Sequence, residues 1–251
     1  MQRVAGNLMT LPVAAVLCAP GTNRDNDVLF ALQLAGASPV AILTNELLQN
    51  PSRINDADIL VIAGGFSYAD ALGAGRLFAV ELEHAVGAQI ATAISERRPI
   101  IGICNGFQTL VRMGILPGSG QHAALGHNTS GVFDCRWVEL EPSSQKCVWT
   151  QNLTNNIECP IAHGEGRFTC DDDTLSNLQR NDQVALRYVS TNPNGSVDNI
   201  AGVCDSTGVV LGLMPHPENH VVRRQHPQSH RGVSRGLGLS IFQSGVCYAR
   251  R

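Results

Sequence analysis

Residues 99–107 constrain the fold of this chain more than any other stretch. The apolar run 99–103 predicts a buried strand, which leads into Cys104, with a glycine two residues before it and another two residues after it. An amphipathic pattern typical of a helix follows at once. Gly102-x-Cys104-x-Gly106 at a strand-to-helix turn is the pattern of a nucleophile elbow, because so sharp a turn leaves no room for neighbouring Cβ atoms. The segment therefore predicts an α/β sheet that presents a sulfur at the end of a strand.

The predicted turn gives Cys104 the surroundings of a nucleophile. The first N–H groups of the new helix lie near the sulfur, where they favour the thiolate and can hold an oxyanion. The alternative is a structural cysteine at a strand end, since free cysteine is often buried. The elbow pattern favours catalysis over that alternative.

A nucleophilic cysteine needs a base, and residues 209–218 supply one. Residues 209–214 predict a strand, and the two prolines that flank His216 exclude a helix. In an extended chain residues i and i+2 point to the same side, so His216 and Glu218 are presented together. The carboxylate then holds one imidazole nitrogen and leaves the other for the sulfur. In isolation this sequence is more typical of a loop histidine beside a solvated acid, but next to a cysteine elbow the catalytic interpretation is favoured.

Two further segments belong to the predicted site. A glycine pair ending in Gly65 closes the strand predicted over residues 58–63, at the sheet edge where ligands of parallel sheets bind. The main-chain N–H groups of Gly65 and Asn105 are therefore candidate oxyanion donors, and a plain glycine turn is the alternative. Gln108 lies one helical turn after Cys104, so we expect it to contact a substrate held over the sulfur.

Strands and helices alternate along the chain in the order that parallel βαβ units produce. We expect a three-layer α/β fold, with an open, mostly parallel sheet and helices on both faces, in a single domain spanning residues 1–251. A change to strict alternation after residue 132 adds some antiparallel strands. The expected strands are 13–19, 40–43, 58–63, 99–103, 133–140, 183–190, 199–205 and 209–214, and the expected helices are 25–37, 76–97 and the one that follows the elbow.

Charge and composition argue against several other classes of protein. The formal net charge is −3 over 251 residues, so nucleic acid and an anionic membrane surface are not expected as partners. Lys146 is the only lysine, and no Gly-Lys-Ser/Thr phosphate loop surrounds it. No run approaches the ~18 apolar residues of a membrane span. The first twenty residues resemble a signal peptide only weakly, because Pro12 interrupts their apolar run.

The eight cysteines are scattered along the chain without a Cys-x-x-Cys pair. This spacing does not match zinc ligands, and a chain of this length needs no disulfides to fold. We therefore expect free thiols, a reducing cytoplasmic environment, and neither a metal nor a cofactor on this chain. The basic, histidine-containing segment 223–235 is a candidate metal site, but a surface loop or partner contact is favoured because nothing completes a ligand set.

Several motifs taken together resemble a known family. Residues 102–108 with His216-Pro217-Glu218 are similar to the class I, or triad, glutamine amidotransferases. More closely, they resemble those members that serve as the glutaminase subunit of the synthase that amidates formylglycinamide ribonucleotide in de novo purine biosynthesis. The matching segments occur in order over most of the chain: 21–23, 64–70, 102–108, 161–168, 192–196 and 214–218.

The resemblance implies a flavodoxin-like fold and a role for each residue of the predicted site. The triad would consist of Cys104 as nucleophile toward the side-chain amide of L-glutamine, His216 as proton carrier and Glu218 as the acid that orients it. The contacts to the oxyanion and the substrate would come from Gly65, Asn105 and Gln108. Glutamate and ammonia are the implied products.

The resemblance also implies a partner protein. Members pass ammonia through a tunnel to a large synthetase subunit that binds ATP, magnesium and the ribonucleotide, and some assemblies add a small bridging subunit. ATP and magnesium are thus expected on the partner, in agreement with the missing phosphate loop. Two departures stand out: residues 127–137 are more similar to the glutaminase domain of single-chain synthases, which leaves the partner's form open, and Asn219 departs from the usual family sequence after the triad acid.

Other interpretations stay open at this point. A cysteine hydrolase or glyoxalase-like stress protein on a related sheet explains the elbow but not the sequence around His216. An interaction module that only docks a synthetase needs none of this chemistry. His163, in the glycine-rich segment 163–167, is an alternative base, although the resemblance places its motif near the site and the synthetase contact rather than in the triad.

Overall fold

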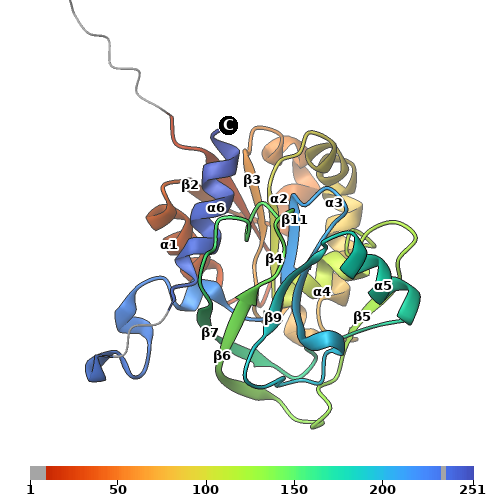
Figure 1. The fold of residues 1–251 in the computed structure, drawn as a ribbon. Coiled ribbons are helices and arrows are strands. Elements are labelled where there is room, and N and C mark those ends of the chain that lie inside the picture. Colours follow the sequence, from red (N-terminus) through yellow and green to blue (C-terminus); the bar gives the residue numbers. More distant parts are fainter. Residues whose placement is uncertain (1–9, 233–235) are drawn as a thin grey trace, which may run out of the picture.

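A large twisted sheet organises the molecule. The computed structural model describes residues 10–232 and 236–251, so residues 1–9 of the amino-terminal segment lie outside the description. Within the described part, nine strands are ordered β2-β1-β3-β4-β11-β10-β9-β6-β7 (Figure 1). The strands from β2 to β11 in this order run parallel to one another, and the remaining pairings are antiparallel. The expected open sheet with added antiparallel strands is confirmed.

The strand bounds show how the two halves of the sheet are built. The parallel strands are β2 (Ser38–Leu43), β1 (Val13–Cys18), β3 (Ile59–Ile62), β4 (Ile100–Ile103) and β11 (Val210–Leu213). The antiparallel strands are β10 (Ile200–Cys204), β9 (Val184–Tyr188), β6 (Asp134–Pro142) and β7 (Ile157–His163). A separate sheet pairs β5 (Ala123–Gly126) with β8 (Arg167–Cys170). Every residue of β3, β4 and β11 is buried, as expected for strands covered on both faces.

Helices cover both faces of the sheet and complete the three layers (Figure 1). α1 (Asp25–Ala35) and α6 (Leu239–Ala249) pack together on one face. On the other face lie α2 (Thr44–Gln49), α3 (Arg76–Ser95) and α4 (Asn105–Arg112). α5 (Asp172–Arg180) connects β8 to β9. The predicted strands and helices are confirmed with ends displaced by a few residues, whereas α2, α5, α6, β5, β7 and β8 were not predicted.

Helix α3 differs from one expectation. Among the described residues it is the helix long and apolar enough, by length and composition, to cross a membrane, whereas no such segment was expected from the sequence. Its apolar residues Phe78, Leu82, Val86 and Ile90 are buried within the protein. An apolar stripe of this kind is what a helix needs to pack on a sheet.

The turn between β4 and α4 is as tight as the glycine spacing predicted. Cys104 has a left-handed φ of 51° with ψ of −104°. A Cβ added to Gly102 would lie 2.6 Å from the carbonyl oxygen of Gly106, and one added to Gly106 would lie 2.0 Å from the carbonyl oxygen of Ile62. Glycine is therefore required at both positions because α4 begins in direct contact with β3 and β4.

Substitution of Gly106 tests this close approach. Gly106→Ala should lower the free energy of unfolding by about 1–3 kcal/mol, because the added methyl group meets a strand carbonyl rather than a flexible side chain. In a chain of this length such a change lowers Tm by several degrees. The measurement is thermal unfolding followed by circular dichroism.

Gly126→Ala is the matched control, since a Cβ at Gly126 has nothing within 4 Å. Equal Tm values for the two variants would show that the elbow does not depend on its glycine.

Candidate active site

Strand pairing brings the predicted nucleophile and base together. β4 ends directly before Cys104, and β11 ends three residues before His216. The two strands are parallel neighbours with Ile103 opposite Leu213. The main-chain N–H of Cys104 donates a hydrogen bond to the carbonyl oxygen of Leu213 at 2.8 Å. Two segments far apart in the sequence therefore end side by side at the carboxyl edge of the sheet.

The three residues of the predicted triad are in contact. His216 Nδ1 lies 2.6 Å from Glu218 Oε1, and both side chains are buried. This contact leaves Nε2 of His216 for the sulfur, and the imidazole interacts with Cys104 both by charge and by a hydrogen bond. Gly64 packs against both partners, because a Cβ there would lie 3.1 Å from His216 Cε1 and 3.5 Å from Cys104 Cβ.

The protonation of His216 follows from its neighbours. Burial, the largest single influence, lowers its pKa, but the combined attraction of Glu218 and Cys104 outweighs burial and raises the pKa to about 10. The imidazole is therefore protonated at neutral pH. A protonated imidazole beside the sulfur can act as a proton donor to a departing group.

The predicted oxyanion donors lie beside the sulfur. Gly65 and Asn105 line the same cavity as Cys104. Gly65 has a φ of 131°, and a Cβ there would lie 2.6 Å from the main-chain nitrogen of Asn23, so only glycine fits. In the described part of the chain, neither the Gly65 nor the Asn105 N–H donates to a main-chain acceptor. Both donors are thus available to a negatively charged oxygen.

The cavity over Cys104 is small, about 190 Å³, and its wall comes from the loop after β3, the start of α4 and the end of β7. Gln108 lines this cavity and is held by two hydrogen bonds. Asn105 Nδ2 donates to Gln108 Oε1 at 3.2 Å, and Gln108 Nε2 donates to the carbonyl oxygen of Glu165 at 2.5 Å. These bonds fix the direction in which the Gln108 amide faces the cavity.

Asp70 belongs to this wall, although no role was predicted for it. Asn105 Nδ2 donates to Asp70 Oδ1 at 3.0 Å, and Asp70 has a left-handed φ of 53°. Burial, the largest influence, raises the pKa of Asp70, and the nearby carboxylate of Glu165 raises it further. The segment 64–70 resembles the family, but its sequence carries no local pattern that indicates this contact.

His163 also lines the cavity, but its contacts differ from those of His216. Its Nδ1 lies 3.1 Å from Asn128 Oδ1, an amide, whereas the carboxylate expected beside a general base belongs to His216. Burial, the largest influence, and the charge of His216 lower the pKa of His163 to about 4. His163 is therefore neutral at pH 7. Its partner Asn128 was not predicted, because the two residues are joined only by the fold.

Two histidines near the carboxyl end, His226 within the segment 223–235 and His220 just before it, form a packed cluster. His220 and His226 both make edge contacts with the Trp137 ring, and His226 Nε2 lies 3.4 Å from Glu158 Oε2. Within residues 10–232 and 236–251, no group of three or more His, Cys, Asp or Glu side chains is arranged to hold a metal ion. Residues 233–235 of this segment lie outside the description.

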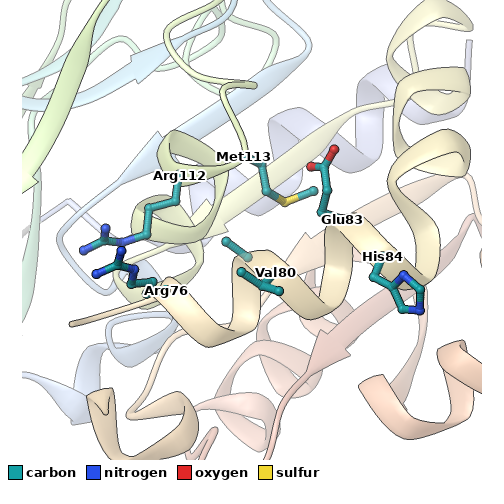
Figure 2. Close-up of a pocket in the computed structure, with 7 residues that line it drawn as sticks. Arg76, Val80, Glu83, His84, Arg112 and Met113 are labelled. Carbon is teal, nitrogen blue, oxygen red and sulfur yellow. The ribbon is translucent and has the colours of Figure 1, made fainter. Parts of the chain in front are cut away.

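A second hollow lies away from the sulfur. It is a groove of about 800 Å³ between α3 and α4 (Figure 2). Arg76 and Arg112 lie side by side at one end, and Glu83 and His84 lie toward the other. None of the predicted site residues is among the described residues that line this groove, so its size does not make it the candidate active site.

Comparison with known proteins identifies the family of this chain. A model of the CobB/CobQ-like glutamine amidotransferase domain matches residues 11–249. The phosphoribosylformylglycinamidine synthase subunit PurQ of Treponema denticola is 44% identical over 94% of this chain and 98% of its own length. The PurQ subunit of Dehalococcoides mccartyi is 40% identical over 94% of this chain and 97% of its own length. In the solved structure of PurLQS from Thermotoga maritima, a chain with 35% identity superimposes with a TM-score of 0.77, covering 95% of this chain and 99% of that one.

The protein is therefore a member of the glutamine amidotransferases, the class that the elbow, the sheet and the domain match define. Within that class it belongs to the family of PurQ subunits of phosphoribosylformylglycinamidine synthase, and the resemblance inferred from its motifs is confirmed.

The neutral state of His163 predicts a pH dependence of folding stability. The pKa of about 4 in the folded protein lies below the ordinary value of 6.5, so between these pH values the unfolded chain binds a proton that the folded chain does not. Stability contributed by neutral His163 is present above pH 6.5 and is lost as the pH falls toward 4. Between pH 7.5 and 5 the expected loss is about 2 kcal/mol.

The measurement is urea unfolding of the wild type and of His163→Asn at both pH values. The wild type should lose more stability than the variant, because Asn does not titrate. Equal losses would mean that His163 binds its proton as readily when folded as when unfolded.

Proposed function

We propose that this chain is the glutaminase subunit of a phosphoribosylformylglycinamidine synthase, in which Cys104, His216 and Glu218 hydrolyse L-glutamine to glutamate and ammonia. The observation that carries the proposal is the buried His216–Glu218 pair, 2.6 Å apart, facing a cysteine in a left-handed elbow. The family membership and the match over nearly the full length of PurQ subunits support it.

The arrangement suits thiolate chemistry on an amide. The Cys104 thiolate attacks the side-chain carbonyl carbon of glutamine, and the N–H groups of Gly65 and Asn105 bind the resulting oxyanion. His216 donates its proton to the departing nitrogen, so ammonia leaves and a thioester forms. Water, deprotonated by the now neutral His216, then releases glutamate. Proton transfer by a positioned histidine typically contributes about 10²–10⁴-fold in rate, and each oxyanion donor about 10²–10³.

Glu218 supports His216 both when the thioester forms and when it is hydrolysed. Its contact at Nδ1 fixes the tautomer and the ring orientation, and its charge stabilises the imidazolium between proton transfers. Gln108 and the Asn105 side chain, joined at 3.2 Å, would hold the substrate over the sulfur.

The released ammonia requires an acceptor on another chain. We propose that this acceptor is a large synthetase subunit, which binds ATP, magnesium and formylglycinamide ribonucleotide, with a small bridging subunit in an assembly of the PurLQS kind. The proposal includes a cytoplasmic location and a single amidotransferase domain, in keeping with a family match over residues 11–249.

Covalent labelling tests the nucleophile. An electrophile that mimics glutamine should modify Cys104 and stop glutamine hydrolysis. The reason is that the Cys104 sulfur lies beside a protonated imidazole and lines a cavity large enough only for a small substrate. Mass spectrometry of the digested protein identifies the modified residue.

Cys104→Ala should abolish labelling, and Cys135→Ala, which removes an exposed thiol, should leave it unchanged. Modification elsewhere, with hydrolysis intact, would favour a hydrolase of another kind. Absence of both labelling and hydrolysis in the complex would favour a module that only docks the synthetase.

Coupling to the synthetase tests the partner. Mixed with the synthetase subunits of its own organism, the wild type should support glutamine-dependent, ATP-consuming amidation of formylglycinamide ribonucleotide. Cys104→Ala should lose the reaction with glutamine by at least about 10³-fold but keep it with ammonium chloride, because only ammonia production needs the thiolate. The assay is ATP consumption with either nitrogen source; loss of both reactions would count against a purely glutaminase role.

A further inference from the structure

His163 carries a buried nitrogen that the proposed triad does not use. Its side chain is 3% exposed, it lines the cavity over Cys104, and its Nε2 has no hydrogen-bond partner within the described residues. A buried polar atom without a partner costs free energy and calls for an explanation. A ligand that brings its own donor into the cavity provides one.

The contacts of Asn128 determine which hydrogen-bonding role this nitrogen can take. Asn128 Nδ2 faces two carbonyl oxygens, those of Val132 at 3.0 Å and His163 at 2.9 Å, and carbonyl oxygens only accept. Asn128 Oδ1 accepts from the main-chain N–H of Gly166 at 3.2 Å, so the orientation of the amide is fixed. His163 Nδ1, 3.1 Å from that oxygen, must then carry the hydrogen. Nε2 of the neutral ring is therefore a lone-pair acceptor.

The position of His163 indicates which part of the substrate meets that acceptor. The end of β7, which carries it, borders the sulfur, since the carbonyl oxygen of Ala162 lies 4.0 Å from Cys104 Sγ. When a carboxamide is attacked at Cys104 with its oxygen toward Gly65 and Asn105, its nitrogen must lie near His216 to be protonated. His163 lies close enough to His216 to respond to its charge. In that orientation the N–H groups of the carboxamide, rather than its oxygen, are directed toward the side of the cavity that His163 lines.

We propose that His163 binds the side-chain amide nitrogen of L-glutamine, accepting one of its N–H groups at Nε2, and thereby makes the site selective for an amide. This inference rests on the proposed glutaminase function and assigns to it a substrate contact outside the triad. Gly166 supports the contact, because its missing side chain lets the backbone pack on the imidazole: a Cβ there would lie 2.3 Å from His163 Cε1. The ring is therefore held by Asn128 at its edge and by Gly166 on its face.

Two substitutions separate this role from a merely structural one. His163→Asn keeps a donor at the position of Nδ1, able to bond Asn128, but has no group at the position of Nε2. His163→Gln places an acceptor at the position of Nε2 but gives up the bond to Asn128. A substrate contact predicts that the Gln variant is the more active of the two, whereas a structural role predicts the reverse.

The measurement compares L-glutamine with the γ-methyl ester of L-glutamate, which has the same carbonyl group and no N–H. In the complex with its synthetase, His163→Asn should lower kcat/KM for glutamine by about tenfold, the value of one neutral hydrogen bond, and change kcat/KM for the ester by less than about twofold. His163→Gln should recover part of the loss for glutamine. Thermal unfolding of both variants checks that they are folded.

Equal losses on the amide and the ester in His163→Asn would overturn the inference, and so would a Gln variant no better than the Asn variant. If His163→Asn does not fold, the His163→Gln variant alone gives the test. The inference would then be overturned if kcat/KM falls more for the ester than for glutamine. A wild-type complex that hydrolyses neither substrate would instead refute the proposed function. If the wild-type complex hydrolyses both substrates and His163→Asn lowers kcat/KM equally for the two, the proposed function stands and only the role of His163 is refuted.

Discussion

The proposed active site depends on the parallel pairing of β4 with β11. Their register places Ile103 opposite Leu213, and the last bond of the ladder, from the N–H of Cys104 to the Leu213 carbonyl oxygen, reaches the elbow itself. The same ladder that holds the middle of the sheet together therefore sets the distance between Cys104 and His216, the proposed nucleophile and base. Because both strands are fully buried, this register is strongly specified: a slip by one residue would exchange their faces.

The second constraint is the close approach of the backbone to the reacting groups, which only glycine allows. Gly64 leaves room for the His216 ring and the Cys104 side chain, and Gly106 lets α4 begin against β3. The N–H groups at the start of α4 and at Gly65 can then point at one small volume. Such crowding explains why a cavity of only about 190 Å³ is lined by both the proposed nucleophile and the two proposed oxyanion donors.

The sequence was sufficient for the parts of the site that depend on local patterns. The elbow was predictable because glycines two residues on either side of Cys104 meet a turn that excludes Cβ atoms. His216 and Glu218 do come together, but the expected extended chain was wrong: Pro217–Asn219 forms a 3-10 helix, which a proline at its first position permits. The helices α5 and α6 were missed although α5 has a clear start, where Asp171 Oδ1 accepts the N–H of Thr174 at 2.7 Å. Strand β7 was not predicted because Pro160 lies within it, and a proline inside an apolar run argues against a strand.

The rest of the site depends on contacts between distant segments, which no local pattern reports. Asp70 faces the cavity only because three successive residues, Tyr68, Ala69 and Asp70, adopt left-handed backbone angles that non-glycine residues rarely take. His163 and Asn128 meet because the chain returns along β7 beside the loop that precedes β6. In both cases a polar group, half-buried at Asp70 and buried at His163, has a partner from elsewhere in the fold and shapes the wall that a substrate meets. A polar group left without a partner in an otherwise satisfied wall is therefore the place to look for a substrate contact, since burial without such a contact would only cost stability.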